Sequence, residues 1–355
     1  MDKQNISILS SALLGMAYGE AFSWSSMFQR SKDLPPWLGR IRHEIEVESK
    51  AENITSNPKP FSLNQSPEPL KPAPGDLTEW AAWTTTLLVE NEGILSHKTL
   101  EDAWRKLTKD RKQIRGRLSV QAALRNLESG ISAPQSGRFN PHYFDDAALG
   151  RAMVIGVVNS GNVALAQEQA GLDASFTQFE DGIWSAEAIA SLFSMAGSAT
   201  SPETLIEVAI QNLPEGSLVK RCVVDALEEC DFHESNVLTT ADYLNREVCN
   251  QIYSYGNIAH EILACLLVIL RTSKGDFNTM VACASLVPSP GSSLLALATA
   301  LAAVLNPEKI EVIENLKILK GLSLPEMKDV DLIDLSHRFG SVNELNDQQN
   351  GKDRS

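Results

Sequence analysis

Cysteine, basic charge and long apolar stretches are all scarce in this 355-residue sequence, and each shortage excludes a class of protein. The five cysteines are an odd number, widely spaced and without a C-x-x-C pair, so neither a disulfide framework nor a zinc site is expected. No apolar run approaches the ~18 residues of a membrane-spanning helix. The net charge of −14 argues against nucleic acid or an anionic membrane surface as a partner. We therefore expect a cytoplasmic protein.

Apolar residues recur at spacings of three and four along most of the chain. Leu9, Leu13 and Ala17 share one face of a predicted helix, and similar stripes run through residues 186–196 and 219–230. Alternating patterns that would indicate β-strands are scarce. The sequence predicts an all-α fold.

Two segments interrupt this helical pattern. Proline, serine, asparagine and lysine crowd much of residues 45–75, which predicts a long surface loop. Residues 341–355 are polar and predict a C-terminal tail. Helical signals lie close to both ends of the loop, so we expect one domain over residues 1–340.

Two motifs near the N-terminus occur in an order typical of one known family. Residues 12–21 read ALLGMAYGEA, and residues 75–79 read GDLTE at the start of a predicted helix. Both resemble motifs of the ADP-ribosylglycohydrolase family. That family usually has an Asp at the place of Glu20, and a Thr and an Asp at the places of Gly75 and Leu77.

Later landmarks of the same family follow in register. They are DDAA at 145–148, DASFTQ at 173–178, DGIW at 181–184 and PGSS at 290–293, with Gln178 at the place of a usual His. The resemblance covers most of residues 6–305. It implies a single compact, all-α ADP-ribosylglycohydrolase-like helical domain.

The resemblance also implies a metal-dependent chemistry that this sequence departs from. Enzymes of the family remove ADP-ribose with a pair of Mg²⁺ ions, and Mg²⁺ requires several hard oxygen ligands. Asp76 and Thr78 remain as residual metal ligands, but Pro290 and Ser292 stand where two Asp are expected. We therefore expect no cofactor, or Mg²⁺ bound only weakly.

The same resemblance implies which side chains line the cleft. The candidate catalytic residues are Asp76, Glu20 and Asp173. The candidate ligand-binding residues are Thr78, Glu79, Asp145, Asp146, Trp184, Gly291 and Ser292. Without metals, two of the carboxylates could act as an acid and base pair through unequal pKa values.

Several of these residues also have simpler structural interpretations, which the sequence leaves open. Asp76 and Thr78 could cap a helix. Asp145 and Asp146, as acids in a first helical turn, favour the helix dipole whatever the function. Trp184 is a candidate for stacking on a ligand, but it could equally belong to the core.

Other conspicuous residues favour structural roles. The basic run at 106–117 predicts a solvated helix face, with a phosphate or an acidic partner as the alternative contact. Trp80 and Trp83 favour the core or a cleft wall. His260, in an apolar helical pattern, favours a hydrogen-bonded core histidine.

Three functions are compatible with these features. The leading hypothesis is a protein with a degraded metal centre that binds ADP-ribose, a related nucleotide or an ADP-ribosylated protein with little or no hydrolysis. The second is an active glycosidase that removes ADP-ribose with the remaining carboxylates. The third is a docking protein whose former cleft binds a protein partner.

Overall fold

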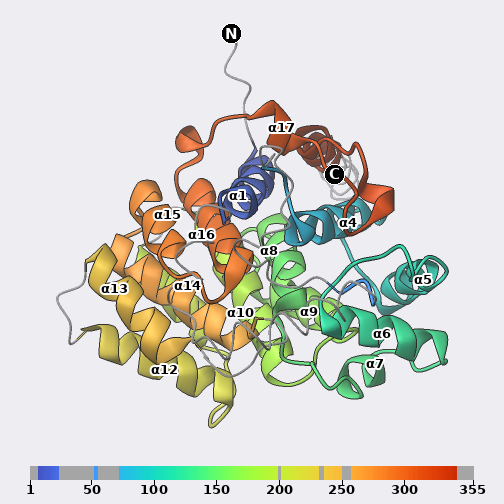
Figure 1. Cartoon of the computed structure of the whole chain (residues 1–355), viewed down its shortest axis with the longest axis horizontal. Helices are drawn as coiled ribbons and strands as arrows, with labels where there is room; N and C mark the ends of the chain where they lie inside the picture. Colours follow the sequence, from blue (N-terminus) through green and yellow to red (C-terminus); the bar gives the residue numbers. More distant parts are fainter. Residues whose placement is uncertain are drawn as a thin grey trace, which may run out of the picture.

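The structure, a computed structural model, describes residues 7–23, 52–54, 72–198, 201–231, 236–249 and 257–341. Among these residues there is no β-strand beyond isolated bridges, and helices dominate (Figure 1). The all-α prediction is therefore confirmed. The longer helices are α1 (Ile8–Phe22), α4 (Asp76–Glu90), α5 (His97–Thr108), α6 (Leu118–Glu128), α8 (Leu149–Val158), α9 (Val163–Ala174), α10 (Asp181–Ala196), α11 (Pro202–Ile210), α12 (Leu218–Asp231), α14 (Ala259–Ser273), α15 (Phe277–Ser285) and α16 (Gly291–Leu305). Shorter elements are α7 (Gln135–Arg138), η2 (Asp146–Ala148), α13 (Val237–Tyr243), η3 (Leu244–Val248), η4 (Pro307–Lys309), α17 (Glu314–Lys317) and η5 (Pro325–Met327).

Helices α1 and α16 come from opposite ends of the described chain and pack directly against each other (Figure 1). A Cβ added at Gly15 would lie 2.7 Å from the carbonyl oxygen of Thr299, so the two backbones approach as closely as glycine allows. Gly19 has a similarly close approach to Leu295 and Ala296. Because residue 15 faces 299 while residue 19 faces 295, the helices are antiparallel. The end of α1 therefore lies beside the start of α16.

Helix α4 lies against α8, which in turn packs on α9 and α10 near the middle of the molecule (Figure 1). An aromatic cluster fills the space between α4 and α5: the rings of Trp80 and Trp104 stack with centroids 5.4 Å apart, and Trp83 meets both edge-on. All three side chains are buried. The prediction of a core or wall role for Trp80 and Trp83 is confirmed.

The predicted apolar stripes lie on the buried faces of their helices. Leu9, Leu13 and Ala17 of α1 are buried, as are the stripe residues of α10 and most of those of α12. His260 is buried in α14 as predicted, but its Nδ1 atom has no hydrogen-bond partner. No helix in the described part of the chain is long and apolar enough to cross a membrane.

The prediction of one solvated helix face over residues 106–117 is wrong. Helix α5 ends at Thr108 and turns follow it, so the basic residues do not share a face. Lys106 is exposed, whereas Arg117 is buried at the start of α6. Most of the predicted loop at 45–75 and of the predicted tail at 341–355 lies outside the described residues. The single domain over 1–340 stays a prediction.

Candidate functional site

Glu20, near the end of α1, binds the first turn of α4. Its Oε2 atom accepts hydrogen bonds from the backbone N–H of Gly75 at 2.7 Å and from the hydroxyl of Thr78 at 2.6 Å. Its carboxylate also accepts the backbone N–H groups of Leu77 and Thr78, at 3.0 and 3.1 Å. These are the N–H groups that a helix leaves without partners at its N-terminus. Glu20 therefore caps α4 from a neighbouring helix.

This inter-helix cap accounts for the glycine that precedes α4. Gly75 is the N-cap residue of α4 and has no side chain to offer. A Cβ at this position would lie 2.6 Å from Oε1 and 2.9 Å from Cδ of Glu20. Thr78, which was a predicted residual metal ligand, directs its hydroxyl to Glu20. Burial and the charge of Asp76 raise the pKa of Glu20 to about 7, despite these donors.

Asp76 and Asp146 both approach one buried guanidinium. The Nε atom of Arg117 lies 3.0 Å from Oδ1 of Asp146 and 3.6 Å from Oδ2 of Asp76. All three residues are buried, with Arg117 only 3% exposed. The 3.0 Å approach to Asp146 is an ion contact and not an aligned hydrogen bond, because neither Nε nor Oδ1 has a hydrogen-bond partner. Together, Asp76, Arg117 and Asp146 form what we call the Arg117 centre.

The charges of the Arg117 centre are mutually stabilising. Burial alone would lower the pKa of Arg117, but the carboxylates of Asp146 and Asp76 raise it above its ordinary value. Burial raises the pKa of Asp76, the charge of Arg117 opposes that rise, and Asp146 adds to it. The guanidinium therefore stays charged and offsets the repulsion between the two acids.

Ser293 and Asn257 close the centre on its other side. The Nη2 atom of Arg117 donates to the Ser293 hydroxyl at 3.0 Å and to Oδ2 of Asp146 at 3.3 Å. The same Oδ2 atom accepts the Asn257 amide at 3.1 Å and the Ser293 hydroxyl. Bridge pairing of Asp145 with Ile258 places Asn257 beside these groups. A small cavity of about 10 Å³ borders Asp76 and Arg117, room for about one water molecule.

Asp145 points to different donors from those of its neighbour Asp146. It accepts hydrogen bonds from the backbone N–H and the hydroxyl of Ser119, and from the side-chain amide of Gln178 at 3.0 Å. It also caps η2 through the N–H of Ala147, which agrees with a structural role at a helix start. Burial and the charge of Asp146 raise its pKa to about 6.

Two of the predicted site carboxylates are bound elsewhere. Glu79 accepts the backbone N–H groups of residues 322–324, at 2.7 to 2.9 Å, and so anchors the C-terminal segment to α4. Asp173 accepts a hydrogen bond from Nε of Arg151 at 2.7 Å, and both side chains are fully enclosed. Arg151 also stacks over Trp104, with its Cζ atom 5.3 Å from the ring centroid. These contacts stabilise helix packing.

The start of α16 contributes Ser293 to the centre. Gly291 is buried with a φ of 64°, a conformation that favours glycine. Ser292 is partly exposed, and the hydroxyl that reaches Asp146 belongs to the next residue, Ser293. Trp184, in the first turn of α10, is partly buried and packs against the core.

Sequence reasoning missed Arg117, Ser119 and Asn257. Arg117 ends a basic run whose other residues looked solvated, and nothing in its local pattern distinguishes it. Ser119 follows two residues later as the second residue of α6, whose N-cap position Arg117 occupies, so its place does not match a capping pattern. Asn257 precedes a long apolar helix, and only tertiary contacts place it beside Asp146.

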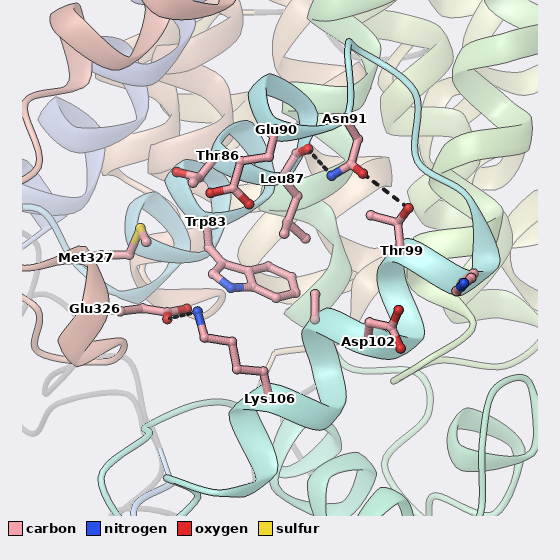
Figure 2. Close-up of a pocket in the computed structure, with 12 residues that line it drawn as sticks. Trp83, Thr86, Leu87, Glu90, Asn91, Thr99, Asp102, Lys106, Glu326 and Met327 are labelled. Carbon is pink, nitrogen blue, oxygen red and sulfur yellow. Dashed lines mark hydrogen bonds and ion pairs between the residues drawn. The ribbon is translucent and has the colours of Figure 1, made fainter.

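A separate surface pocket of about 550 Å³ lies between α4, α5 and η5 (Figure 2). Trp83 forms part of its wall, and Lys106 and Glu326 form an ion pair with 3.5 Å between Nζ and Oε2 at one edge (Figure 2). The part of α4 that lines this pocket is its second half, whereas the predicted site residues of α4 lie in its first turn. None of the predicted site residues lines it.

The oxygen atoms of the Arg117 centre do not suit a pair of Mg²⁺ ions. Each ion needs near-octahedral oxygen coordination, and carboxylates must supply the compensating charge. Here the Glu20 carboxylate binds α4, and Asp76 and Asp146 face a guanidinium. Among the described residues, no group of three or more Asp, Glu, His and Cys side chains is arranged to hold a metal ion.

Comparison with known protein families gives one result. A family profile described as ADP-ribosylglycohydrolase matches residues 5–287. The matched segment contains Glu20, Asp76, Arg117 and Asp146, and it ends before α16 begins. No curated protein matches the chain with significant similarity.

Proposed function

Because the chain belongs to the ADP-ribosylglycohydrolase family, we propose that it recognises ADP-ribose, a related nucleotide or an ADP-ribosylated protein with little or no hydrolysis. One observation carries this proposal: every candidate catalytic carboxylate is already hydrogen-bonded or ion-paired to other groups of the protein itself. Glu20 binds the start of α4, Asp173 binds Arg151, and Asp76 faces Arg117.

Hydrolysis of a glycosidic bond requires a general acid and a carboxylate that activates water or attacks the sugar directly. Such a carboxylate must reach the reacting atoms within hydrogen-bonding distance. Glu20 and Asp145 have raised pKa values, which suits an acid, but both are nearly inaccessible and surrounded by helix-end and side-chain donors. Moving either one to activate water would leave several buried N–H groups without acceptors.

Binding without turnover makes different demands on the site. It needs a stable framework that presents fixed donors and acceptors, not a mobile base. The contacts of Glu20, Asp145 and Asp146 hold α1, α4, α6 and α16 in fixed relation at the place where the family motifs converge. The proposed ligand class follows from family membership and from this retained framework.

Isothermal titration calorimetry with ADP-ribose, with and without Mg²⁺ on the order of 5–10 mM, tests binding. Mass spectrometry of an ADP-ribosylated protein incubated with the chain tests hydrolysis. We expect saturable binding that is independent of Mg²⁺ and no release of ADP-ribose over hours. Asp76→Asn should alter binding, whereas the control Asp225→Asn, exposed on α12, should not.

Two outcomes would replace the proposal with a rival. Release of ADP-ribose that is lost in Asp76→Asn would establish an active glycohydrolase. Absence of any ADP-ribose binding, together with a stable complex with a protein partner, would establish a docking protein.

A further inference from the structure

Arg117 introduces a permanent positive charge at the point where carboxylates of α4 and η2 converge. Its Nε atom lies 3.0 Å from an oxygen atom of Asp146 and 3.6 Å from one of Asp76. A guanidinium does not lose its proton under physiological conditions, so this charge is as constant as that of a bound ion.

Two buried acids that approach one another require a cation or a proton between them. In a metal centre, a divalent ion supplies that charge and binds oxygen atoms at fixed distances. In this chain, the Arg117 fork supplies the charge, and it also donates hydrogen bonds to Ser293 and Asp146. The buried Oδ1 atom of Asp146 has no hydrogen-bond donor, so the nearby guanidinium charge is its compensation.

We propose that Arg117 is a resident cation that takes the place of a divalent metal between Asp76 and Asp146. Its removal should leave two facing carboxylates and the Ser293 hydroxyl around a vacated volume next to an existing cavity. Hard oxygen donors of this kind bind Mn²⁺ and Mg²⁺. The variant should therefore acquire a divalent-cation site that the natural chain excludes. This inference does not depend on which ligand the protein recognises.

Arg151 provides a matched control for this inference. It is also fully buried and pairs with a carboxylate, that of Asp173, at 2.7 Å. However, its other donors go to the Ala147 carbonyl and the Thr177 hydroxyl, so only one acid would be exposed on its removal. Arg151→Ala should lose stability as Arg117→Ala does, but should gain no metal site.

The experiment measures thermal unfolding of the full chain at several Mn²⁺ and Mg²⁺ concentrations, and Mn²⁺ binding by electron paramagnetic resonance. We expect the melting temperature of the natural chain to be unchanged by the metals. Arg117→Ala should melt roughly 4–7 °C lower, because it leaves uncompensated buried charge. At a Mn²⁺ concentration near 100 times its dissociation constant, this variant should regain about 3–4 °C.

A second substitution locates the recovered site. In the Arg117→Ala background, Asp146→Asn should abolish both the Mn²⁺-induced rise and the bound-Mn²⁺ signal. If Arg117→Ala fails to fold in buffer, Arg117→Val, which retains part of the side-chain stem but vacates the space of the guanidinium, is titrated in the same way. Mn²⁺ binding by the natural chain that Asp146→Asn removes would overturn the proposal. So would a Mn²⁺ response of the Arg117 variants no larger than that of Arg151→Ala.

Discussion

Glu20 fills the space that a side chain at residue 75 would need. A larger residue at position 75 should therefore be tolerated only when the side chain at residue 20 is shorter. The carboxylate of Glu20 receives the N–H groups of Gly75, Leu77 and Thr78, and a Cβ at residue 75 would lie 2.6 Å from its Oε1 atom. The φ of Gly75 is −104°, which every amino acid adopts freely. Threonine is also about as good an N-cap residue as glycine. Any loss in Gly75→Thr must therefore come from the collision with Glu20.

The magnitude follows from the hydrogen bonds that the carboxylate would lose. To relieve the contact, Glu20 must withdraw from one or two of its buried donors, and a hydrogen bond to a charged group contributes about 1.5–3 kcal/mol. We expect Gly75→Thr to lower the free energy of unfolding by ~3 kcal/mol, or the melting temperature by roughly 4 °C. Glu20→Asp alone should also destabilise the chain, because its shorter side chain no longer reaches the α4 donors.

The double variant Glu20→Asp/Gly75→Thr should be more stable than the sum of the single losses, by ~1–2 kcal/mol of coupling. Urea unfolding followed by circular dichroism at fixed pH measures all four proteins of the cycle. Gly340→Thr serves as the control, because Gly340 has no positive φ and nothing lies within 4 Å of its added Cβ. Additive losses in the double variant, or an unchanged Gly75→Thr, would refute the paired-substitution reasoning.

Three further perturbations test other parts of the fold. Burial raises the pKa of Glu187 from 4.5 to about 7 in the folded chain, so its contribution to stability is present below pH 4.5 and is lost as pH rises through 7. Glu187→Gln should therefore raise stability at pH 8 by on the order of 1–2 kcal/mol, allowing for partial solvation, but leave stability at pH 4 unchanged. The exposed Glu207→Gln is the control, and equal pH profiles for Glu187→Gln and the natural chain would contradict the assignment. Glu79→Gln should lower the free energy of unfolding by ~1–3 kcal/mol and speed hydrogen exchange of the backbone amides at 322–324, since a side-chain amide would face their N–H donors. Unchanged exchange at these residues would count against Glu79 as the group that holds the segment. Gly15→Ala should lower the free energy of unfolding, followed by thermal unfolding, by ~1–3 kcal/mol because it forces α1 away from α16. Unchanged stability would show that the two helices can accommodate an added methyl group.

Most of the fold was accessible from the sequence because burial follows helical spacing in this chain. The stripes of α1, α10 and α12 predicted both the elements and their buried faces. The order of family motifs assigned Glu20 and Asp76 to one predicted cleft, and in the structure the Glu20 carboxylate binds the first turn of α4, which Asp76 begins. What these carboxylates do there was less accessible, because a cap supplied by one helix to another leaves no local pattern.

Arg117 was inaccessible for a more general reason. Its neighbours in the sequence, Lys112 and Arg115, are exposed, and the same residue types in a row read as solvated surface. Burial of Arg117 depends on where α6 begins relative to α4, which is a tertiary property. The register at α16 shows a related limit: Ser292 and Ser293 are adjacent and chemically identical, but a rotation of 100° per residue directs only Ser293 to Asp146.

The Arg117 centre and the carboxylates around it are better understood through the charges that they carry than through the metal ligands that the chain lacks. Glu20, Asp76, Asp145 and Asp146 bring up to four negative charges into a buried region where Arg117 supplies one positive charge. The remaining negative charge is compensated by backbone donors and by protons. Burial first, and neighbouring charge second, raises the pKa of Glu20 to about 7 and that of Asp145 to about 6. A divalent pair would add four positive charges and would hold such groups ionised. A centre balanced by one guanidinium, hydrogen bonds and proton uptake therefore differs in charge from one balanced by two divalent ions.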